Sequence, residues 1–293
     1  MASFQRMRIP SIDGVLLADK AAGMSSHDVV LLVRRATGEK RVGHAGTLDP
    51  FATGLLVLLL GHATRLLPYI DGEPKVYEAT IRFGSETDTD DLLGTTMRTA
   101  AVPSDYDVRA AIPRLTGMLD QIPPDYSAKR VEGRRAYEAA RAGETLTLAA
   151  ARVRVDEWQI SGWRGADLDV VITCGGGTYI RALARDLGRC TGSAAHLVAL
   201  RRTRSGPFRV ENAVPAEAIA SGSAPVLVPL AALVSKPTQQ LEDADVARIA
   251  RGLDCRAEVA GSHAALISRE GELVAVAERC NDRWQPRVVF RRG

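Results

Sequence analysis

The chain has 293 residues, a hydrophobic content of 46% and a formal net charge of +3. This length is typical of about two domains, and the apolar content excludes a disordered chain. The longest apolar run, Leu55 to Leu60, is far shorter than the roughly 20 residues that a membrane span needs. The N-terminal residues lack the apolar segment of a signal peptide, and no two cysteines have C-x-x-C spacing. We therefore expect a cytoplasmic protein with reduced thiols and neither a membrane contact nor a metal site.

The first predicted elements are a strand and a helix. Residues 14–23 read GVLLADKAAG, which predicts a short apolar strand that ends in a turn at Lys20. Ser25 and Ser26 favour a helix start, and apolar residues at helical spacing extend that helix to about Arg35. From the pattern alone, Lys20 is an ordinary surface lysine.

Asp49 lies at the centre of the stretch RVGHAGTLDPFATGLLVLLLGHATR, residues 41–65. Asp followed by Pro is typical of a helix start, because Asp caps the first N–H groups and Pro fits the first helical position. A cap alone needs neither the upstream His44 nor the two glycines that flank it. A carboxylate at a helix start is also favoured by the helix dipole, so a cap and a reactive group are compatible.

Residues 75–83 alternate in the manner of a strand, with Tyr77, Ala79, Ile81 and Phe83 on one face. Tyr77 is then either the first aromatic residue of the core or, if it faces RNA, a platform for a flipped base. The acidic turn at 85–94 lacks the spacing of a calcium loop, and we predict that it is solvated.

Residues 108–119 have helical spacing interrupted by Pro113, which predicts two short helical pieces. The segment at about 122–150 opens with Pro-Pro, becomes basic and ends in a predicted helix at 136–142. We interpret it as an exposed, positively charged loop suited to phosphate contact.

Residues 168–174 predict a buried strand, followed by the turn Gly175–Gly177 and a helix over 178–187. A glycine-rich turn before a helix can hold a phosphate, which leaves a nucleotide-binding enzyme as an alternative, but the dinucleotide fingerprint is missing. Tyr179 and Arg181 fall in the first helical turn. From the pattern alone, Arg181 is an ordinary surface charge. Basic residues are concentrated at 129–154 and 181–209. This pattern fits either a polyanionic partner or an Arg-rich composition with solvated faces.

The C-terminal part predicts a separate β-rich unit. Residues 213–237 resemble a linker with a short helix, and a helix is expected over 241–252. Strands are expected at 264–268, 273–277 and 287–290.

Several blocks, in the same order, resemble the TruB family of tRNA pseudouridine synthases over residues 10–210. The blocks are DKAAGMSS (19–26), GHAGTLDPFATGLL (43–56), KVY (75–77), PPDYSAKRVEGRRAY (123–137), GTYIR (177–181) and LRRT (200–203). The family usually has Pro where this chain has Ala21. The resemblance implies an α+β pseudouridine synthase fold, in which helices flank a mixed, largely antiparallel sheet. It divides the chain into a catalytic domain at 1–228, with an RNA-binding insertion at about 122–150, and a PUA-like RNA-binding domain at 229–293.

The same resemblance implies a role for each matching residue. Asp49 is the catalytic carboxylate, and Arg181 pairs with it. Tyr77 packs on the target base, Tyr179 and Leu200 line the base pocket, and His44 occupies the space that the base leaves in the RNA. Lys20 is a further expected substrate contact. The expected contacts to the RNA backbone are Lys129, Arg130, Arg201 and Arg202.

The implied reaction is the isomerisation of the uridine at position 55 in the T-arm loop of tRNA. We expect no cofactor, no metal, no guide RNA and no protein partner, and we expect a monomer. Whether Asp49 attacks C1′ or uracil C6 stays open. The alternative is a non-catalytic protein that binds or folds tRNA in the same basic cleft.

Overall fold

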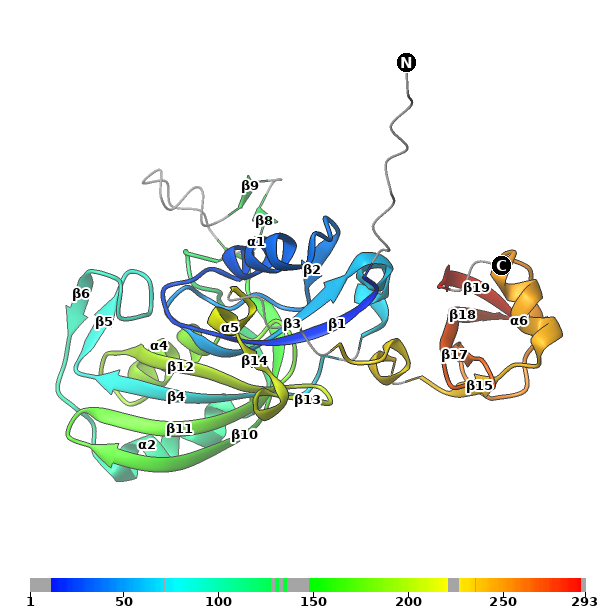
Figure 1. Cartoon of the computed structure of the whole chain (residues 1–293). Coiled ribbons are helices and arrows are strands. Elements are labelled where there is room, and N and C mark those ends of the chain that lie inside the picture. Colours follow the sequence, from blue (N-terminus) through cyan, green and yellow to red (C-terminus); the bar gives the residue numbers. More distant parts are fainter. Residues whose placement is uncertain are drawn as a thin grey trace, which may run out of the picture.

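The computed structural model describes residues 12–70, 72–127, 130–131, 134–135, 148–220, 227–234 and 236–290. Within these ranges the chain forms a ten-stranded mixed sheet and a five-stranded sheet, joined by the segment around residue 230 (Figure 1). None of the helices in these ranges is long and apolar enough to cross a membrane.

The large sheet has the order β14-β1-β3-β12-β4-β11-β10-β7, with β13 beside β12 and β2 beside β3. Most neighbouring pairs are antiparallel, and β1–β14 and β3–β12 are parallel. Its strands are β1 (Gly14–Lys20), β2 (Val42–His44), β3 (Thr53–Leu60), β4 (Lys75–Phe83), β7 (Gly117–Gln121), β10 (Ala151–Arg164), β11 (Asp167–Cys174), β12 (Ala195–Ser205), β13 (Phe208–Arg209) and β14 (Val214–Pro215). The short pairs β5 (Ser85–Thr87) with β6 (Thr96–Thr99) and β8 (Arg130–Val131) with β9 (Arg134–Arg135) lie outside this sheet.

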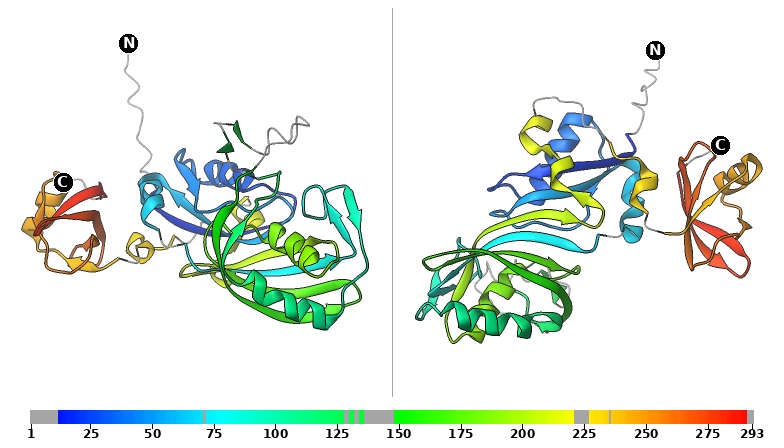
Figure 2. Two further views of the ribbon diagram at one scale, coloured as in Figure 1. Left: turned by 180° about the vertical axis from the view of Figure 1, so that it is seen from behind. Right: turned by 90° about the horizontal axis from the view of Figure 1, so that it is seen from below.

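One face of β4 builds the largest core. The predicted alternation is confirmed, because Tyr77, Ala79, Ile81 and Phe83 are all buried. The helices α2 (Asp105–Ala111) and α4 (Ile180–Cys190) cover this face and close the core (Figure 2). Tyr77 therefore lies at the end of a packed apolar layer, which fixes the position of its ring.

The apolar run at 55–60 is a strand, so the predicted helix start at Asp49 is wrong. Leu56, Leu58 and Leu60 pack on the side of α1 (Ser26–Thr37), while Leu55, Val57 and Leu59 join a second cluster with the 3-10 helix η1 (Gly61–Tyr69). Both faces of β3 are buried, and a strand buried on both faces has a continuous apolar sequence instead of an alternating one.

The start of α1 is confirmed at Ser25. The Ser25 side chain accepts from the backbone N–H of Asp28, and the Asp28 carboxylate accepts from the Ser25 N–H, which forms a capping box. Farther along, the predicted helical pieces over 108–119 end with the 3-10 helix η2 (Ile112–Leu115), because β7 pairs with β10 from Gly117 onward. The helix predicted at 136–142 lies outside the described residues.

The small sheet has the order β15-β17-β18-β19-β16 and packs with α6 (Asp243–Ala250) around Trp284. Its strands are β15 (Thr238–Gln240), β16 (Cys255–Arg256), β17 (His263–Ile267), β18 (Leu273–Cys280) and β19 (Arg283–Val289). The predicted helix and three predicted strands are confirmed, and β15 and β16 were not predicted. In the preceding segment, the short helices α5 (Ala216–Ala220) and η4 (Leu230–Leu233) flank β14 and the small sheet.

Candidate active site

Asp49 and Arg181 form a bidentate ion pair between the loop before β3 and the first turn of α4. Arg181 Nη2 lies 2.8 Å from Asp49 Oδ1, and Nε lies 3.0 Å from Oδ2. The Arg181 side chain is 4% exposed and that of Asp49 is 32% exposed. The predicted pairing is therefore confirmed, and Arg181 is not a surface charge. The carboxylate is fixed by two charge-assisted hydrogen bonds and still reaches solvent.

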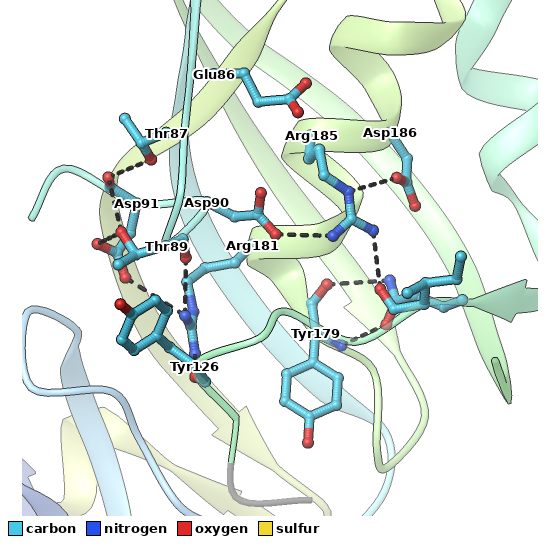
Figure 3. A network of polar contacts seen from close by, with 12 residues as sticks. Glu86, Thr87, Thr89, Asp90, Asp91, Tyr126, Tyr179, Arg181, Arg185 and Asp186 are labelled. Carbon is cyan, nitrogen blue, oxygen red and sulfur yellow. Dashed lines mark hydrogen bonds and ion pairs between the residues drawn. The ribbon is translucent and has the colours of Figure 1, made fainter. Parts of the chain in front are cut away.

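The remaining donors of Arg181 are also bound, which fixes its orientation. Nη1 donates to the carbonyl of Thr89 and Nη2 to that of Tyr126, each at 2.9 Å (Figure 3). Asp91 Oδ2 lies 3.6 Å from Nη1 and supplies a second carboxylate. Arg181 thus connects the Asp49 loop to the loops that carry Thr89 and Tyr126.

Three carboxylates of the acidic turn, Glu86, Asp90 and Asp91, are buried, whereas Asp88 is exposed. The prediction that the turn is solvated is therefore wrong for these three. Asp90 accepts from Arg185 at 2.9 Å (Figure 3). Glu86 pairs with Arg189. Burial raises the pKa of Asp90 to about 6, although the charge of Arg185 opposes that rise. Arginines at four-residue spacing on α4 face this turn, and that spacing was a signal in the sequence.

These ion pairs also change the interpretation of the basic segment at 181–209. Its arginines are largely neutralised by carboxylates within the chain instead of facing an external polyanion. Arg201 donates to both oxygens of Asp19, at 3.0 and 2.7 Å. Of the other predicted backbone contacts, Lys129 lies outside the described residues, and Arg130 belongs to β8 with its side chain outside the description.

Lys20 positions the loop that carries Asp49. Its side chain has no exposed surface, and Nζ donates to the carbonyls of Ala21 at 2.9 Å, Met24 at 2.7 Å and Pro50 at 3.3 Å. Burial lowers the pKa of Lys20 to about 8, although the charge of Asp49 opposes that shift. Lys20 is thus bound to three carbonyls of the chain, and its predicted contact with the substrate stays a prediction.

Arg202 has a similar structural role, and its predicted contact with phosphate stays a prediction. Its side chain is 1% exposed and donates to the carbonyls of Leu55 at 2.8 Å, Gly46 at 3.1 Å and Thr47 at 3.5 Å. These carbonyls lie before and after Asp49 in sequence. Arg202 therefore holds both ends of the loop against β12.

A pocket of about 260 Å³ opens beside the ion pair. The structure brings five predicted residues together in its lining: Asp49, Tyr77, Tyr179, Arg181 and Leu200. It also places there residues that we did not predict as pocket residues: Gly46, Thr47, Leu48, Lys75, Gly177, Thr178 and Ile180, together with Arg202. Tyr77 is 7% exposed, and burial raises its pKa, so its ring presents only a small surface to the pocket.

Gln121 was missed by the sequence analysis and positions Tyr179. Its side-chain amide accepts from the Tyr179 N–H at 2.9 Å and donates to the Tyr179 carbonyl at 3.1 Å. Tyr179 is the N-cap residue of α4, where no side-chain cap is present. No sequence signal linked Gln121 to a residue so distant in the chain.

His44 does not line the pocket. It ends β2 half-buried, and its Nδ1 is buried without a hydrogen-bond partner among the described residues. Burial lowers the pKa of His44, and the charge of Arg202 lowers it further. Its role toward the RNA stays a prediction.

The glycine-rich turn before α4 is occupied by the chain's own carboxylate. Glu73 Oε1 accepts from the Gly176 N–H at 2.6 Å, in the position that a bound phosphate would take. This contact gives no support to the nucleotide-binding alternative. Within the described ranges, no group of three His, Cys, Asp or Glu side chains is arranged to hold a metal ion.

Comparisons with known proteins agree with this geometry. Residues 34–180 match the model of the TruB family pseudouridylate synthase (N terminal domain), and residues 181–224 match that of the tRNA pseudouridylate synthase B C-terminal domain. The chain is 46% identical to the tRNA pseudouridine synthase B of Thermobifida fusca (strain YX), with 95% of this chain and 98% of that protein covered. It is 42% identical to the tRNA pseudouridine synthase B of Paenarthrobacter aurescens (strain TC1), with 96% of each covered. The chain belongs to the TruB family of pseudouridylate synthases.

Solved structures support the fold. The structure of an H/ACA RNP bound to a substrate RNA containing 2'-deoxyuridine matches with a TM-score of 0.71 at 22% identity, over 95% of this chain and 85% of that chain. A Cbf5-Nop10-Gar1 complex matches with a TM-score of 0.72 at 23% identity, over 95% of this chain and 85% of that chain. The pseudouridine synthase fold inferred from the sequence is thus confirmed.

Proposed function

We propose that this protein isomerises the uridine at position 55 in the T-arm loop of tRNA to pseudouridine. The observation that carries the proposal is the bidentate Asp49–Arg181 pair on the wall of a pocket lined by Tyr77, Tyr179 and Leu200. The membership of the chain in the TruB family supports the reaction, and the names of the relatives support tRNA as the substrate.

The reaction is an isomerisation that conserves atoms, so it consumes no second substrate. The N1–C1′ bond breaks, the uracil turns, and C5 bonds to C1′. The proton that C5 loses is balanced by one that N1 gains, and no electron or phosphate donor is consumed. Asp49 presents a carboxylate of fixed orientation to the sugar and base, while Arg181 stabilises its charge.

The target base must leave its stack to reach Asp49, at a cost of a few kcal/mol. Tyr77 offers a ring for stacking, and Leu200 offers an apolar wall on the neighbouring strand. We place His44 on the RNA side of the site, where it would fill the space that the base leaves.

We further propose that the segment at about 122–150 and a PUA-like domain at 229–293 add RNA contacts to a catalytic domain at 1–228. The basic composition of the first segment and the separate five-stranded sheet of the second support this division. The enzyme acts as a monomer in the cytoplasm, without guide RNA or protein partner.

Chemical mapping of pseudouridine in an unmodified tRNA transcript tests the proposal. The purified protein is incubated with the transcript in the presence of a chelator and no other additive. We expect pseudouridine at position 55 and nowhere else in the transcript. Binding without conversion would favour the non-catalytic alternative, and conversion at a different position would overturn the T-arm assignment.

A further inference from the structure

Lys75 is the cation of the pocket for which the described part of the chain supplies no hydrogen-bond or ion-pair partner. It is the first residue of β4 and shares a strand face with Tyr77, two residues farther along. Both residues line the pocket beside Asp49 and Arg181. The ammonium of Lys75 therefore projects from the sheet toward the place that a flipped nucleotide would occupy.

Two glycines locate this ammonium between the Asp49 loop and the turn before α4. Nζ of Lys75 lies 3.7 Å from the position that a Cβ would take at Gly46, in the Asp49 loop. It lies at the same 3.7 Å from the corresponding position at Gly176, in the turn before α4. Lys75 thus lies where both loops border the pocket.

The other cations around the pocket are all bound by the chain. Lys20 and Arg202 each donate to three carbonyls, and Arg181 binds Asp49 together with two carbonyls. For Lys75, by contrast, no hydrogen bond or ion pair to Nζ is found among the described residues. Glu73, the nearby carboxylate, binds the Gly176 N–H and Arg154.

The surroundings of Lys75 disfavour an unpaired charge. Burial lowers the pKa of Lys75, and the positive charge of Arg202 lowers it further. Cys174 and Glu73 only partly oppose this shift. A half-buried cation beside a second cation is electrostatically complementary to an anion that enters the pocket.

We propose that Lys75 binds an anionic oxygen of the flipped nucleotide. This inference rests on the proposed function. One source of that oxygen is the uracil ring, whose carbonyls gain negative charge when the electron pair of the N1–C1′ bond moves onto the ring. The other is the phosphate of the same nucleotide. In both cases Lys75 keeps its protons, because the proton lost from C5 and the one gained at N1 already balance.

Substitution of Lys75 tests the inference by single-turnover pseudouridine formation and by tRNA binding. We expect Lys75→Met to lower the rate about 10²-fold, because it removes one donor to a developing negative charge. Lys75→Arg should retain most of the wild-type rate, because it keeps a positive charge. Lys236→Met, at an exposed lysine far along the chain, should match the wild type. Urea unfolding of each variant confirms that the fold is kept.

Two modified substrates distinguish the sources of the oxygen. The first is a tRNA with 5-fluorouridine at the target, whose ring stabilises negative charge by itself. The measured quantity is the rate at which the N1-linked nucleoside is consumed. If Lys75 binds the ring, the rate difference between the wild type and Lys75→Met should be about tenfold smaller on this substrate than on ordinary tRNA. A neutral methylphosphonate at the target nucleotide lowers the wild-type rate to that of Lys75→Met if the phosphate is bound.

A folded Lys75→Met variant that works within about threefold of the wild type on ordinary tRNA, with unchanged tRNA binding, would overturn the inference. That result would leave the proposed function intact. A wild-type protein that forms no pseudouridine would instead refute the proposed function itself.

Discussion

Arg181 contacts both carboxylate oxygens of Asp49 across 132 positions of sequence, and its own position is fixed by the Thr89 and Tyr126 carbonyls. The pair joins the loop before β3 to the first turn of α4, two elements on different parts of the sheet. This arrangement orients the carboxylate before substrate arrives, so little reorganisation is needed in the transition state.

Two substitutions of Arg181 distinguish the effect of its positive charge from the effect of its bidentate contact with Asp49. Arg181→Lys retains one positive charge but loses the second parallel hydrogen bond to Asp49. We expect kcat to fall about 10²-fold in Arg181→Lys and further in Arg181→Met, while tRNA affinity stays within a few-fold of the wild type. Single-turnover rates and filter binding measure both quantities. Equal rates for Arg181→Lys and the wild type would refute the need for a bidentate contact.

Gly54 is predicted to be irreplaceable, because β3 and β12 approach closely at this position. Its φ is +99°, and a Cβ would lie 2.3 Å from the Arg202 carbonyl. Gly192 also has a positive φ, of +70°, but its Cβ would meet nothing within 4 Å. We expect Gly54→Ala to lower the free energy of unfolding by at least about 2 kcal/mol more than Gly192→Ala. Urea unfolding measures both, and similar losses would contradict the close approach.

The raised pKa of Asp90 predicts that the free energy of unfolding depends on pH. The pKa of about 6 exceeds the value of 3.8 expected in the unfolded chain. Between these values the folded protein binds more protons than the unfolded chain, so this group contributes stability that is full below about pH 4 and lost as pH rises through about 6. Asp90→Asn removes the titration and keeps the left-handed backbone conformation, which Asn tolerates.

The measurement is the difference in the free energy of unfolding between the wild type and Asp90→Asn. As pH rises from about 4 to about 7, this difference should shift against the wild type by up to about 3 kcal/mol. A pH-independent difference would show that folding does not raise the pKa of Asp90.

Local patterns predicted much of the fold. The alternation at 75–83 identified β4, and Ser25 with Asp28 identified the start of α1. The run at 55–60 was misassigned, because its periodicity does not distinguish a doubly buried strand from a helix. Only the packing of α1 on one side and η1 on the other decides that question.

For the candidate site, the motif resemblance identified five residues that line the pocket but not the residues that hold them in place. Lys20 and Arg202 were expected at the RNA because both are basic and lie in matching blocks. The structure shows them buried among backbone carbonyls. The role of Gln121 depends on a long-range backbone contact that no local pattern encodes.

The most direct test of the central claim is pseudouridine formation by Asp49→Asn on unmodified tRNA. The control is Asp282→Asn, at an exposed position in the turn between β18 and β19. We expect the rate for Asp49→Asn to fall by at least about 10⁴-fold while tRNA affinity is retained, and the control to match the wild type. Pseudouridine formation by Asp49→Asn at a rate near that of the wild type would contradict the assignment of Asp49 as the catalytic carboxylate.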